Sequence, residues 1–352
     1  MKLIEDWEVA LRVIEKIEKA GFEAVIVGGA VRDYLLKRNI HDVDVATNAL
    51  PEEIKQIFSS TVDVGIEHGT VVVLDEGKPI EVTTYRTDGT YRDYRRPEEV
   101  TFVRELPQDL ERRDFTINAM AFTKDGDIID LFGGKEDLKK GIIRAVGDAN
   151  SRFREDALRM LRAVRFSAQL GFSIEEGTMK AIQKDSDLIE FIAKERIHME
   201  LSKIFVADYV YLGIKNLIEC ELANFLPGNF EKHLEEWKNF KAYLPEIGWA
   251  YLALLNRDDV TTIWNFYKNS NKEKNFAKKV IQAYEQLLSR WNEYDYFSND
   301  LMILETAYDF AQWQGIDVPF SKDMIAKVKE NLPIQSMDDF ALNGNLLMKW
   351  SE

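Results

Sequence analysis

The sequence contains almost no cysteine and no long hydrophobic run. Cys220 is the only cysteine among 352 residues, which excludes an intrachain disulfide framework and fits a reducing compartment. No stretch of about 18 apolar residues is present, so we expect no membrane span. The N-terminal segment up to Phe22 carries acids among its apolar residues and lacks the uninterrupted apolar core of a signal peptide. These absences predict a soluble cytoplasmic protein.

Basic charge is also in short supply. Lysine and arginine total 46 against 61 acidic residues, which gives a formal net charge of −15. Taken alone, this balance argues weakly against nucleic-acid binding, but a basic groove can lie in an acidic protein. Many of the arginines crowd one part of the chain: Arg92, Arg95, Arg96, Arg104, Arg112, Arg113, Arg152, Arg154, Arg159, Arg162 and Arg165.

The two halves of the chain differ in their hydrophobic pattern. The first half alternates short β-rich runs with helical signals, including strands predicted over residues 23–29 and 41–48 and a hairpin over 70–86. After about residue 148, apolar residues recur at helical spacing and strand signals largely vanish. With 45% hydrophobic residues, the chain can form two or more cores. We expect an α/β head with a mixed sheet, followed by an all-α region.

A strand, a Gly-Gly turn and a helix follow one another within residues 25–36. Gly28 and Gly29 would let backbone N–H groups approach an anion, and the helix N-terminus would add positive partial charge. Arg32 would supply a fixed positive charge for a phosphate. The spacing matches neither the Walker loop nor the dinucleotide fingerprint, and a plain strand-to-helix turn is the alternative interpretation.

Two aspartates alternate with valines soon afterwards, in the sequence D-V-D-V that begins at Asp42. Residues i and i+2 of a strand face the same way, so Asp42 and Asp44 would project together. Two close carboxylates repel unless a cation intervenes, and Mg²⁺ suits one or two carboxylates with substrate phosphates. Glu81, in a nearby predicted strand, is the candidate third acid. Solvent-facing strand positions are the alternative for all three residues.

The segment over residues 154–166, R-E-D-A-L-R-M-L-R-A-V-R-F, predicts a helix with a polar row. Glu155 and Arg159 would be i,i+4 neighbours, and Asp156 and Arg159 i,i+3 neighbours. Cytosine and adenine both present an amino donor beside a ring acceptor. An Asp acceptor beside an Arg donor would therefore accept C and A and reject U and G. The alternative is an ordinary salt-bridged helix surface.

Five motifs in order give the sequence a family resemblance. They include V-G-G-A-V-R-D-Y-L-L with H-D-V-D-V-A-T, R-R-D-F-T-I-N-A-M-A-F, D-L-F-G-G-K-E-D-L, the segment 154–166, and E-R-I-H-M-E-L. Together, over residues 23 to 201, they resemble bacterial class II tRNA nucleotidyltransferases, the CCA-adding enzymes, and the related poly(A) polymerases.

The resemblance implies roles for individual residues. Asp42 and Asp44 would hold two catalytic Mg²⁺ ions, and Gly29 and Arg32 would contact the triphosphate of CTP or ATP. The residues with implied roles in nucleotide binding are Arg113, Glu155, Asp156, Arg159, Arg162 and Arg165. In the run Arg112-Arg113-Asp114 the acid would orient the arginine pair, with a surface salt bridge as the alternative.

The resemblance also implies a domain order. We expect a catalytic head over 1–147, a base-recognising neck over 148–200, a tRNA-binding body over 201–290 and a partial helical tail over 291–352. The sequence stops where relatives continue with further tail helices, which would affect the grip on tRNA.

The implied activity is template-independent addition of CCA to the tRNA 3′ end, with release of pyrophosphate. Residues 85–103 resemble the flexible loop associated with the change from C to A specificity, which argues against addition of C alone. An A-adding enzyme and a poly(A) polymerase are the alternatives within the family. A metal-dependent glycosyltransferase ranks lower because it does not account for the R-R-D-F-T-I-N-A-M motif or the pair of Asp156 and Arg159. A non-catalytic RNA-binding relative ranks lower because it would not need two clustered carboxylates.

Overall fold

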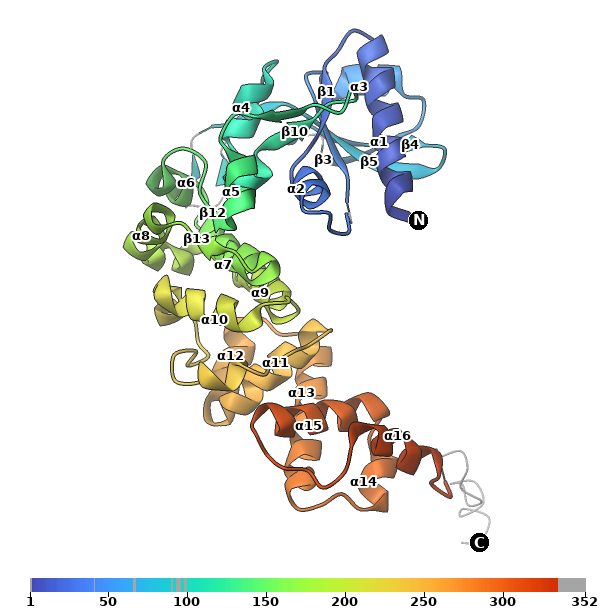
Figure 1. Ribbon diagram of the computed structural model, residues 1–352, viewed down its shortest axis with the longest axis vertical. Helices are drawn as coiled ribbons and strands as arrows, with labels where there is room; N and C mark the ends of the chain where they lie inside the picture. The colour runs from blue at the N-terminus through green and yellow to red at the C-terminus, as the bar shows by residue number, and fades with distance from the viewer. Residues whose placement is uncertain are drawn as a thin grey trace, which may run out of the picture. The chain divides into compact units, whose positions relative to one another are not determined.

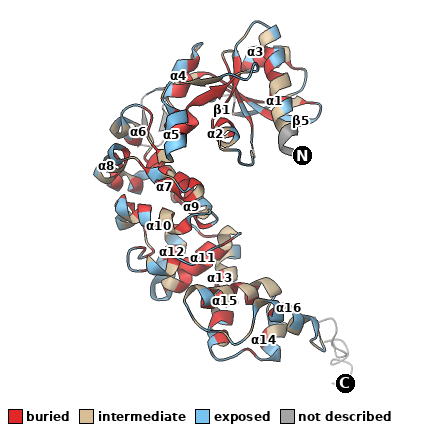
Figure 2. Cartoon of the chain, viewed as in Figure 1, coloured by how far each residue is buried: buried red, intermediate tan, exposed pale blue. Residues whose placement is uncertain are grey.

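The structure is a computed structural model that describes residues 2–40, 42–65, 68–89, 91–92, 96–97 and 100–334. The chain divides into two compact units. The first contains Met1–Ala193 and Asn216–Phe225, and the second contains Lys194–Lys215 and Leu226–Glu352. Each unit has its own buried core, visible as red segments in Figure 2.

A seven-stranded sheet forms the centre of the first unit (Figure 1). Its strand order is β11-β10-β1-β2-β5-β4-β3. The bounds are β1 Ala24–Val27, β2 Asp44–Thr47, β3 Thr61–Gly65, β4 Thr70–Asp75, β5 Lys78–Thr84, β10 Met120–Phe122 and β11 Ile128–Asp130. Strands β2 and β5 are parallel, and the other neighbouring pairs are antiparallel. The sheet is therefore mixed, as the sequence predicted.

Short strand pairs accompany this sheet. Strand β6 (Arg86–Asp88) pairs with β9 (Val100–Phe102), and β7 (Tyr91–Arg92) pairs with β8 (Arg96–Pro97). These pairs fall within the loop predicted over residues 85–103, part of which lies outside the described residues. Strands β12 (Ile142–Ile143) and β13 (Ser173–Ile174) pair in parallel.

Helices cover the sheet and extend the first unit. They are α1 Lys2–Lys19, α2 Gly29–Leu35, α3 Pro51–Ile57, α4 Leu106–Glu111, α5 Gly134–Lys140, α6 Ala149–Glu155, α7 Leu158–Leu170 and α8 Glu176–Lys184. Short 3₁₀ turns are η2 Thr116–Asn118, η3 Ser186–Phe191 and η4 Leu222–Phe225. Helix α1 packs against β1, β2 and β5. Leu106 and Leu110 of α4 belong to one buried cluster with Val25 and Val27 of β1, so α4 and β1 share a core.

The D-L-F-G-G-K-E-D-L motif runs from the last residue of β11 into α5. The Asp130 carboxylate accepts the backbone N–H groups of Gly134 and Lys135 at 2.8 and 2.9 Å, which satisfies donors that a helix N-terminus leaves unpaired. A Cβ atom on Gly134 would collide with the Thr116 carbonyl oxygen. The glycine therefore allows α5 to approach η2, directly after the R-R-D-F segment.

The second unit is helical. Its helices are α9 Lys194–Phe205, α11 Pro245–Leu255, α12 Val260–Phe266, α13 Asn271–Leu288, α14 Glu293–Ser298, α15 Leu301–Trp313 and α16 Lys322–Glu330, with 3₁₀ turns η5 Glu235–Trp237 and η6 Arg257–Asp259. Helix α10 (Val210–Glu219) runs from this unit into the first. Aromatic side chains form much of the core of the second unit. The side chains of Trp237, Trp249 and Tyr251 are at most 1% exposed. The prediction of a helical second half is confirmed, with the two-residue strand β13 (Ser173–Ile174) as an exception.

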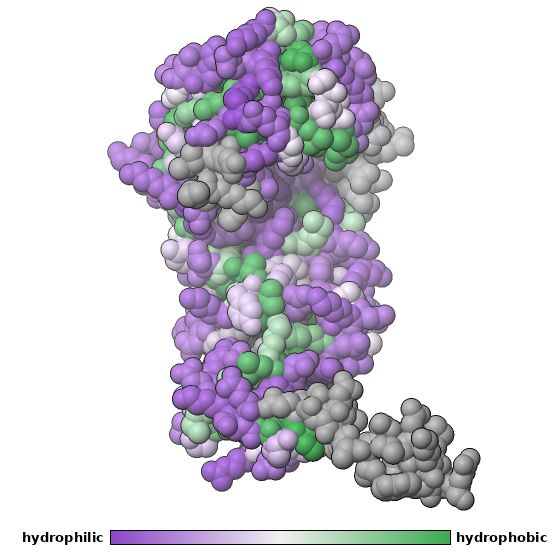
Figure 3. All heavy atoms as spheres, turned by 90° about the vertical axis from the view of Figure 1, so that its right-hand side faces the viewer, coloured by the Kyte–Doolittle hydropathy of each residue, from purple (hydrophilic) through white to green (hydrophobic). Residues whose placement is uncertain are grey.

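The hydropathy of the surface and of the helices follows the pattern seen in the sequence, which has no long hydrophobic run. Hydrophilic side chains cover most of the face drawn in Figure 3. Among the residues that the structure describes, no helix is long and apolar enough to cross a membrane.

Candidate active site

The Gly-Gly turn joins β1 to α2 and brings an arginine close to its backbone. Gly28 has a φ of 73°, a conformation that residues with a Cβ atom rarely adopt. A Cβ atom at this position would also lie 3.2 Å from Nη1 of Arg113. A Cβ atom on Gly29 would lie 3.5 Å from Nη2 of Arg32. The glycines thus place two guanidinium groups against one turn, and Gly28 meets both a conformational and a steric requirement.

The paired aspartates lie beside this turn. Strand β2 begins at Asp44, opposite Val27 of the neighbouring strand β1. Asp42 precedes the strand, so the strand predicted from residue 41 onward is shorter than expected. The exposed positions of Asp42 and Asp44 still alternate with buried Val43 and Val45. The sheet therefore buries the valines and leaves both carboxylates accessible to solvent.

Glu81 is the next acid of the sheet. In the parallel pairing of β2 with β5, Glu81 lies directly opposite Asp44. Desolvation by the surrounding protein raises the pKa of Asp44. The negative charges of Glu81 and Asp42 raise this pKa further, whereas the positive charge of Arg113 lowers it. Asp44 is thus surrounded by like charge as well as by one cation. Among the described residues, no group of three or more histidine, cysteine, aspartate or glutamate side chains is placed to hold a metal ion.

The two arginines of the R-R-D-F motif share one buried carboxylate. Asp109, only 1% exposed, binds Nη2 of Arg112 at 2.8 Å and Nη2 of Arg113 at 3.0 Å. Burial raises the pKa of Asp109, but the two guanidinium groups outweigh it and hold that pKa below its usual value. The acid that orients this pair is therefore Asp109, and the expectation that Asp114 does so is wrong. Asp109 lies in α4, three and four residues before the two arginines that follow the helix, and this spacing was the signal in the sequence.

Asp114 instead binds the helix that follows the head. Its carboxylate accepts Nε of Arg162 at 2.8 Å and the Asn118 amide at 3.1 Å. Asn118 in turn accepts Nη1 of Arg32 at 2.9 Å through its carbonyl oxygen. One hydrogen-bonded chain therefore connects the arginine of the glycine turn with an arginine of α7.

This network predicts a pH-dependent stability. Burial alone would raise the pKa of Asp114, but Arg162 and Asn118 lower it from 3.8 to about 2. Because the folded-state pKa is depressed, the contribution to stability is complete above pH 3.8 and is lost as the pH falls toward about 2. It is on the order of 2 kcal/mol. We expect the unfolding free energies of wild type and Asp114→Asn, measured in urea, to converge over this pH range. A difference that stays constant would show that folding does not depress the pKa of Asp114.

The polar segment after the head is not one continuous helix. Helix α6 ends at Glu155, and Asp156 has extended backbone angles of −135° and 103°. The Asp156 carboxylate accepts the backbone N–H of Leu158 at 3.1 Å, at the start of α7. An aspartate offers the backbone such an alternative to helical hydrogen bonds. The prediction of a single helix over residues 154–166 is therefore wrong at Asp156.

Arg159 is nevertheless fixed in place. Its Nη1 donates to Glu155 Oε2 at 2.6 Å, and its Nη2 donates to the Arg112 carbonyl oxygen at 2.9 Å. Arg159 is only 8% exposed, so the alternative of an ordinary surface salt bridge does not apply to it. Arg165 is equally buried, whereas the Arg162 side chain is 34% exposed. The structure thus brings the head arginines and the first turns of α7 together within one unit.

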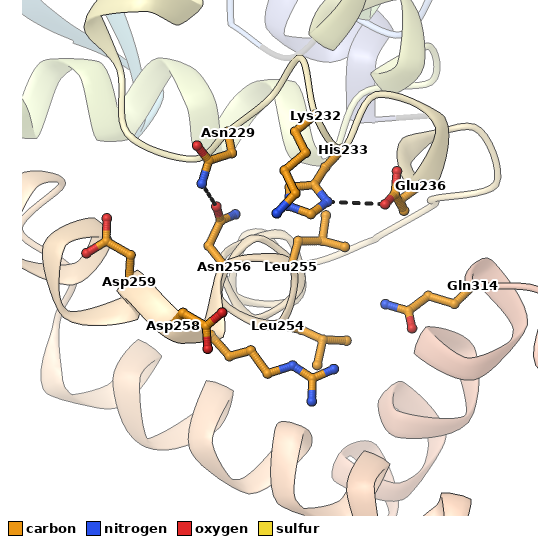
Figure 4. Close-up of a pocket in the computed structure, with 11 residues that line it drawn as sticks. Asn229, Lys232, His233, Glu236, Leu254, Leu255, Asn256, Asp258, Asp259 and Gln314 are labelled. Carbon is orange, nitrogen blue, oxygen red and sulfur yellow. Dashed lines mark hydrogen bonds and ion pairs between the residues drawn. The ribbon is translucent and has the colours of Figure 1, made fainter.

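A separate polar pocket of about 480 Å³ lies in the second unit (Figure 4). Its lining includes Lys232 and Arg257 but also the acids Glu236, Asp258 and Asp259. This mixture of charges does not fit a triphosphate. All of its lining residues belong to the second unit, whereas every candidate site residue belongs to the first.

Comparison with known proteins identifies the family. The poly(A) polymerase head domain matches residues 24–144, the probable RNA and SrmB-binding site of polymerase A matches 171–231, and a putative tRNA nucleotidyltransferase domain 2 matches 245–352. The CCA-adding enzyme of Ligilactobacillus salivarius is 45% identical over 98% of this chain and 87% of its own length. This chain belongs to the CCA-adding enzymes. It is therefore a nucleotidyltransferase, and the family resemblance stated from the motifs is confirmed.

Other CCA-adding enzymes match as extensively. That of Streptococcus sanguinis is 43% identical over 99% of this chain and 88% of its own length. The crystal structure of the Bacillus stearothermophilus CCA-adding enzyme in complex with CTP has a TM-score of 0.87 at 37% identity, covering 98% of this chain and 88% of that one. The Thermotoga maritima CCA-adding enzyme complexed with tRNA-CCA has a TM-score of 0.63 at 22% identity and covers 97% and 85%, which shows a shared fold.

Proposed function

We propose that this CCA-adding enzyme adds C, C and A to the 3′ end of tRNA without a nucleic-acid template, using CTP and ATP. The observation that carries the proposal is that one unit contains all of these groups. Arg113 lies against the Gly28 turn and near Asp44. Arg159 donates a hydrogen bond to the Arg112 carbonyl oxygen. A relative that is 37% identical was solved with CTP. The acceptor stem and 3′ end of tRNA are the proposed partner, and the single buried cysteine fits a cytoplasmic location.

The arginines and glycines would hold the triphosphate. Gly28 and Gly29 would let the triphosphate approach the backbone of the turn, and Arg113 and Arg32, which lie against that turn, would supply positive charge. The tRNA 3′-hydroxyl oxygen would attack the α-phosphorus, forming a new phosphodiester bond as the bond to pyrophosphate breaks. The hydroxyl proton passes to solvent. Asp109 and Asp33 keep the guanidinium groups of Arg113 and Arg32 in place.

Two Mg²⁺ ions are the proposed cofactor, held by Asp42 and Asp44. The residues fit, because both carboxylates are solvent-accessible and close together. Desolvation raises the pKa of Asp44, and the acidic neighbours Glu81 and Asp42 raise it further, an excess of negative charge that a divalent cation would relieve. When bound, such ions lower the pKa of an attacking hydroxyl and stabilise a departing phosphate. Glu81, opposite Asp44, is the proposed third acid.

Base choice would rest on Asp156 and Arg159. The carboxylate would accept the amino group of cytosine or adenine, and the guanidinium would donate to the adjacent ring nitrogen. Glu155 holds Arg159 in the required orientation through the 2.6 Å contact. Uracil and guanine reverse this pattern and would leave buried polar groups unpaired. Arg162 and Arg165 are proposed to assist nucleotide binding from α7.

A nucleotide-dependence assay tests the proposed function. With a tRNA that ends before CCA, we expect CTP alone to add two residues, ATP alone to add none, and both together to complete CCA. The products are resolved by electrophoresis at single-nucleotide resolution. A protein that adds no C but adds one A to tRNA ending in CC would be an A-adding enzyme, and a long A tail would indicate a poly(A) polymerase. Either result contradicts the proposal.

A further inference from the structure

Phe166 lies beneath three guanidinium groups. The centroid of its ring is 4.1 Å from Cζ of Arg165, 5.2 Å from that of Arg32 and 5.5 Å from that of Arg162. All three lie within the ~6 Å over which a ring face attracts a cation. Arg162 and Arg165 share α7 with the ring, whereas Arg32 comes from α2. The ring therefore brings together charges from two distant parts of the sequence.

The ring is itself held in place. Phe166 is 5% exposed, and the ring of Phe115 meets it at 5.7 Å with an interplanar angle of 82°. Phe115 is fully buried and directly follows Asp114, which binds Arg162. Two consecutive residues of the head thus contact two residues that are one turn apart on α7. This arrangement fixes both the ring and one of the arginines above it.

Three like charges around one ring need compensation. A ring has two faces, so at least two of the three guanidinium groups share a face and repel each other. Asp33 binds Arg32 at 2.9 Å and Asp114 binds Arg162 at 2.8 Å, which relieves part of this repulsion. The negative ring faces attract all three cations. A guanidinium group that stacks on a ring keeps its N–H donors in its own plane, where they can meet phosphate oxygens.

We propose that Phe166 is a positioning residue that orients Arg32, Arg162 and Arg165 toward the triphosphate of the incoming nucleotide. This inference rests on the proposed function, which places these arginines at the nucleotide. The Arg162 side chain, 34% exposed, is the group that reaches the ligand. Arg32 and Arg165 are largely buried and act through their charge. With only 5% exposure, Phe166 offers no face on which a base can stack.

Direct binding measurements test this role. Phe166→Leu keeps an apolar side chain but removes the ring, and we expect the Kd values of CTP and ATP to rise roughly 5- to 30-fold. Both nucleotides should be affected alike, because the triphosphate is common to them, and kcat at saturating nucleotide should change less than KM. The matched control is Phe122→Leu. Phe122 is 7% exposed and packs against the rings of Trp7 and Tyr34, so its loss should leave both Kd values unchanged.

Fluorinated phenylalanines at position 166 provide a second arm that does not depend on packing. Each added fluorine weakens the negative ring face while nearly preserving its shape, so nucleotide affinity should fall stepwise with fluorination. Nucleotide Kd values that change neither in Phe166→Leu nor on fluorination would overturn the inference. An equal loss of nucleotide affinity in Phe122→Leu would also overturn it. A wild-type protein that binds neither CTP nor ATP would instead overturn the proposed function.

Discussion

Replacing Asp44 with asparagine should lower the rate of CMP and AMP incorporation by about 10³-fold or more, because the carboxylate proposed to position metal charge at the reacting phosphate would be lost. Asp44 is the first residue of β2 and lies opposite both Val27 and Glu81. Asparagine keeps the size of the side chain, so the sheet should remain intact. The measurement is single-turnover incorporation from labelled CTP and ATP into tRNA that ends before CCA. Asp42→Asn should behave similarly.

The matched control for Asp44 is Asp63→Asn. Asp63 is an exposed acid on β3 of the same sheet and pairs with Lys55 at 2.8 Å. We expect this variant to incorporate both nucleotides at the wild-type rate. Undiminished activity in Asp44→Asn, with the same unfolding midpoint as wild type, would remove Asp44 from the catalytic machinery.

The Asp156→Asn variant should lose most of its preference for CTP and ATP over the other nucleotides. The amide oxygen can still accept the Leu158 N–H, so the turn between α6 and α7 is preserved. The proposed charged acceptor for the amino group of the base would be lost, and we expect kcat/KM for CTP and ATP to fall by about 10²-fold or more. Discrimination against UTP should decrease at the same time, because an amide group can also donate. The four nucleotides are assayed one at a time.

Asp148→Asn is the corresponding control. Asp148 caps α6 through the Ser151 N–H at 3.0 Å and is also an aspartate at a helix start. Its replacement should leave the ratio of kcat/KM values for CTP and UTP unchanged. If Asp156→Asn also retained the wild-type ratio, base choice would reside elsewhere in the protein.

Much of the fold was predictable because the relevant signals are local. The hairpin of β4 and β5, the glycine turn after β1 and the all-α second half each follow from residue patterns within about ten positions. The position of Glu81 beside Asp44 required only that two predicted strands be neighbours, and the register confirms this.

The features that the sequence did not reveal depend on long-range contacts or on competing local ones. The interruption at Asp156 arises because its carboxylate competes for a backbone donor, which the helical spacing of the segment conceals. Asp114 and Arg162 are 48 positions apart, so their pairing was not visible in either motif. Arg32 of α2 and Phe166 of α7 are also far apart in the sequence, so the contact between them was not visible in either motif.

The hydrogen bond from Arg159 to the Arg112 carbonyl has a consequence for how such an enzyme can change its preference. Arg112 precedes Arg113 in the chain, and both are bound by Asp109. Arg159, which is proposed to read the base, is therefore hydrogen-bonded to the peptide group that precedes Arg113, which is proposed to bind the triphosphate. We therefore expect that selection for a new base, in nature or in a mutant library, would shift both residues together. Fidelity and turnover in this protein should accordingly evolve as a single trait.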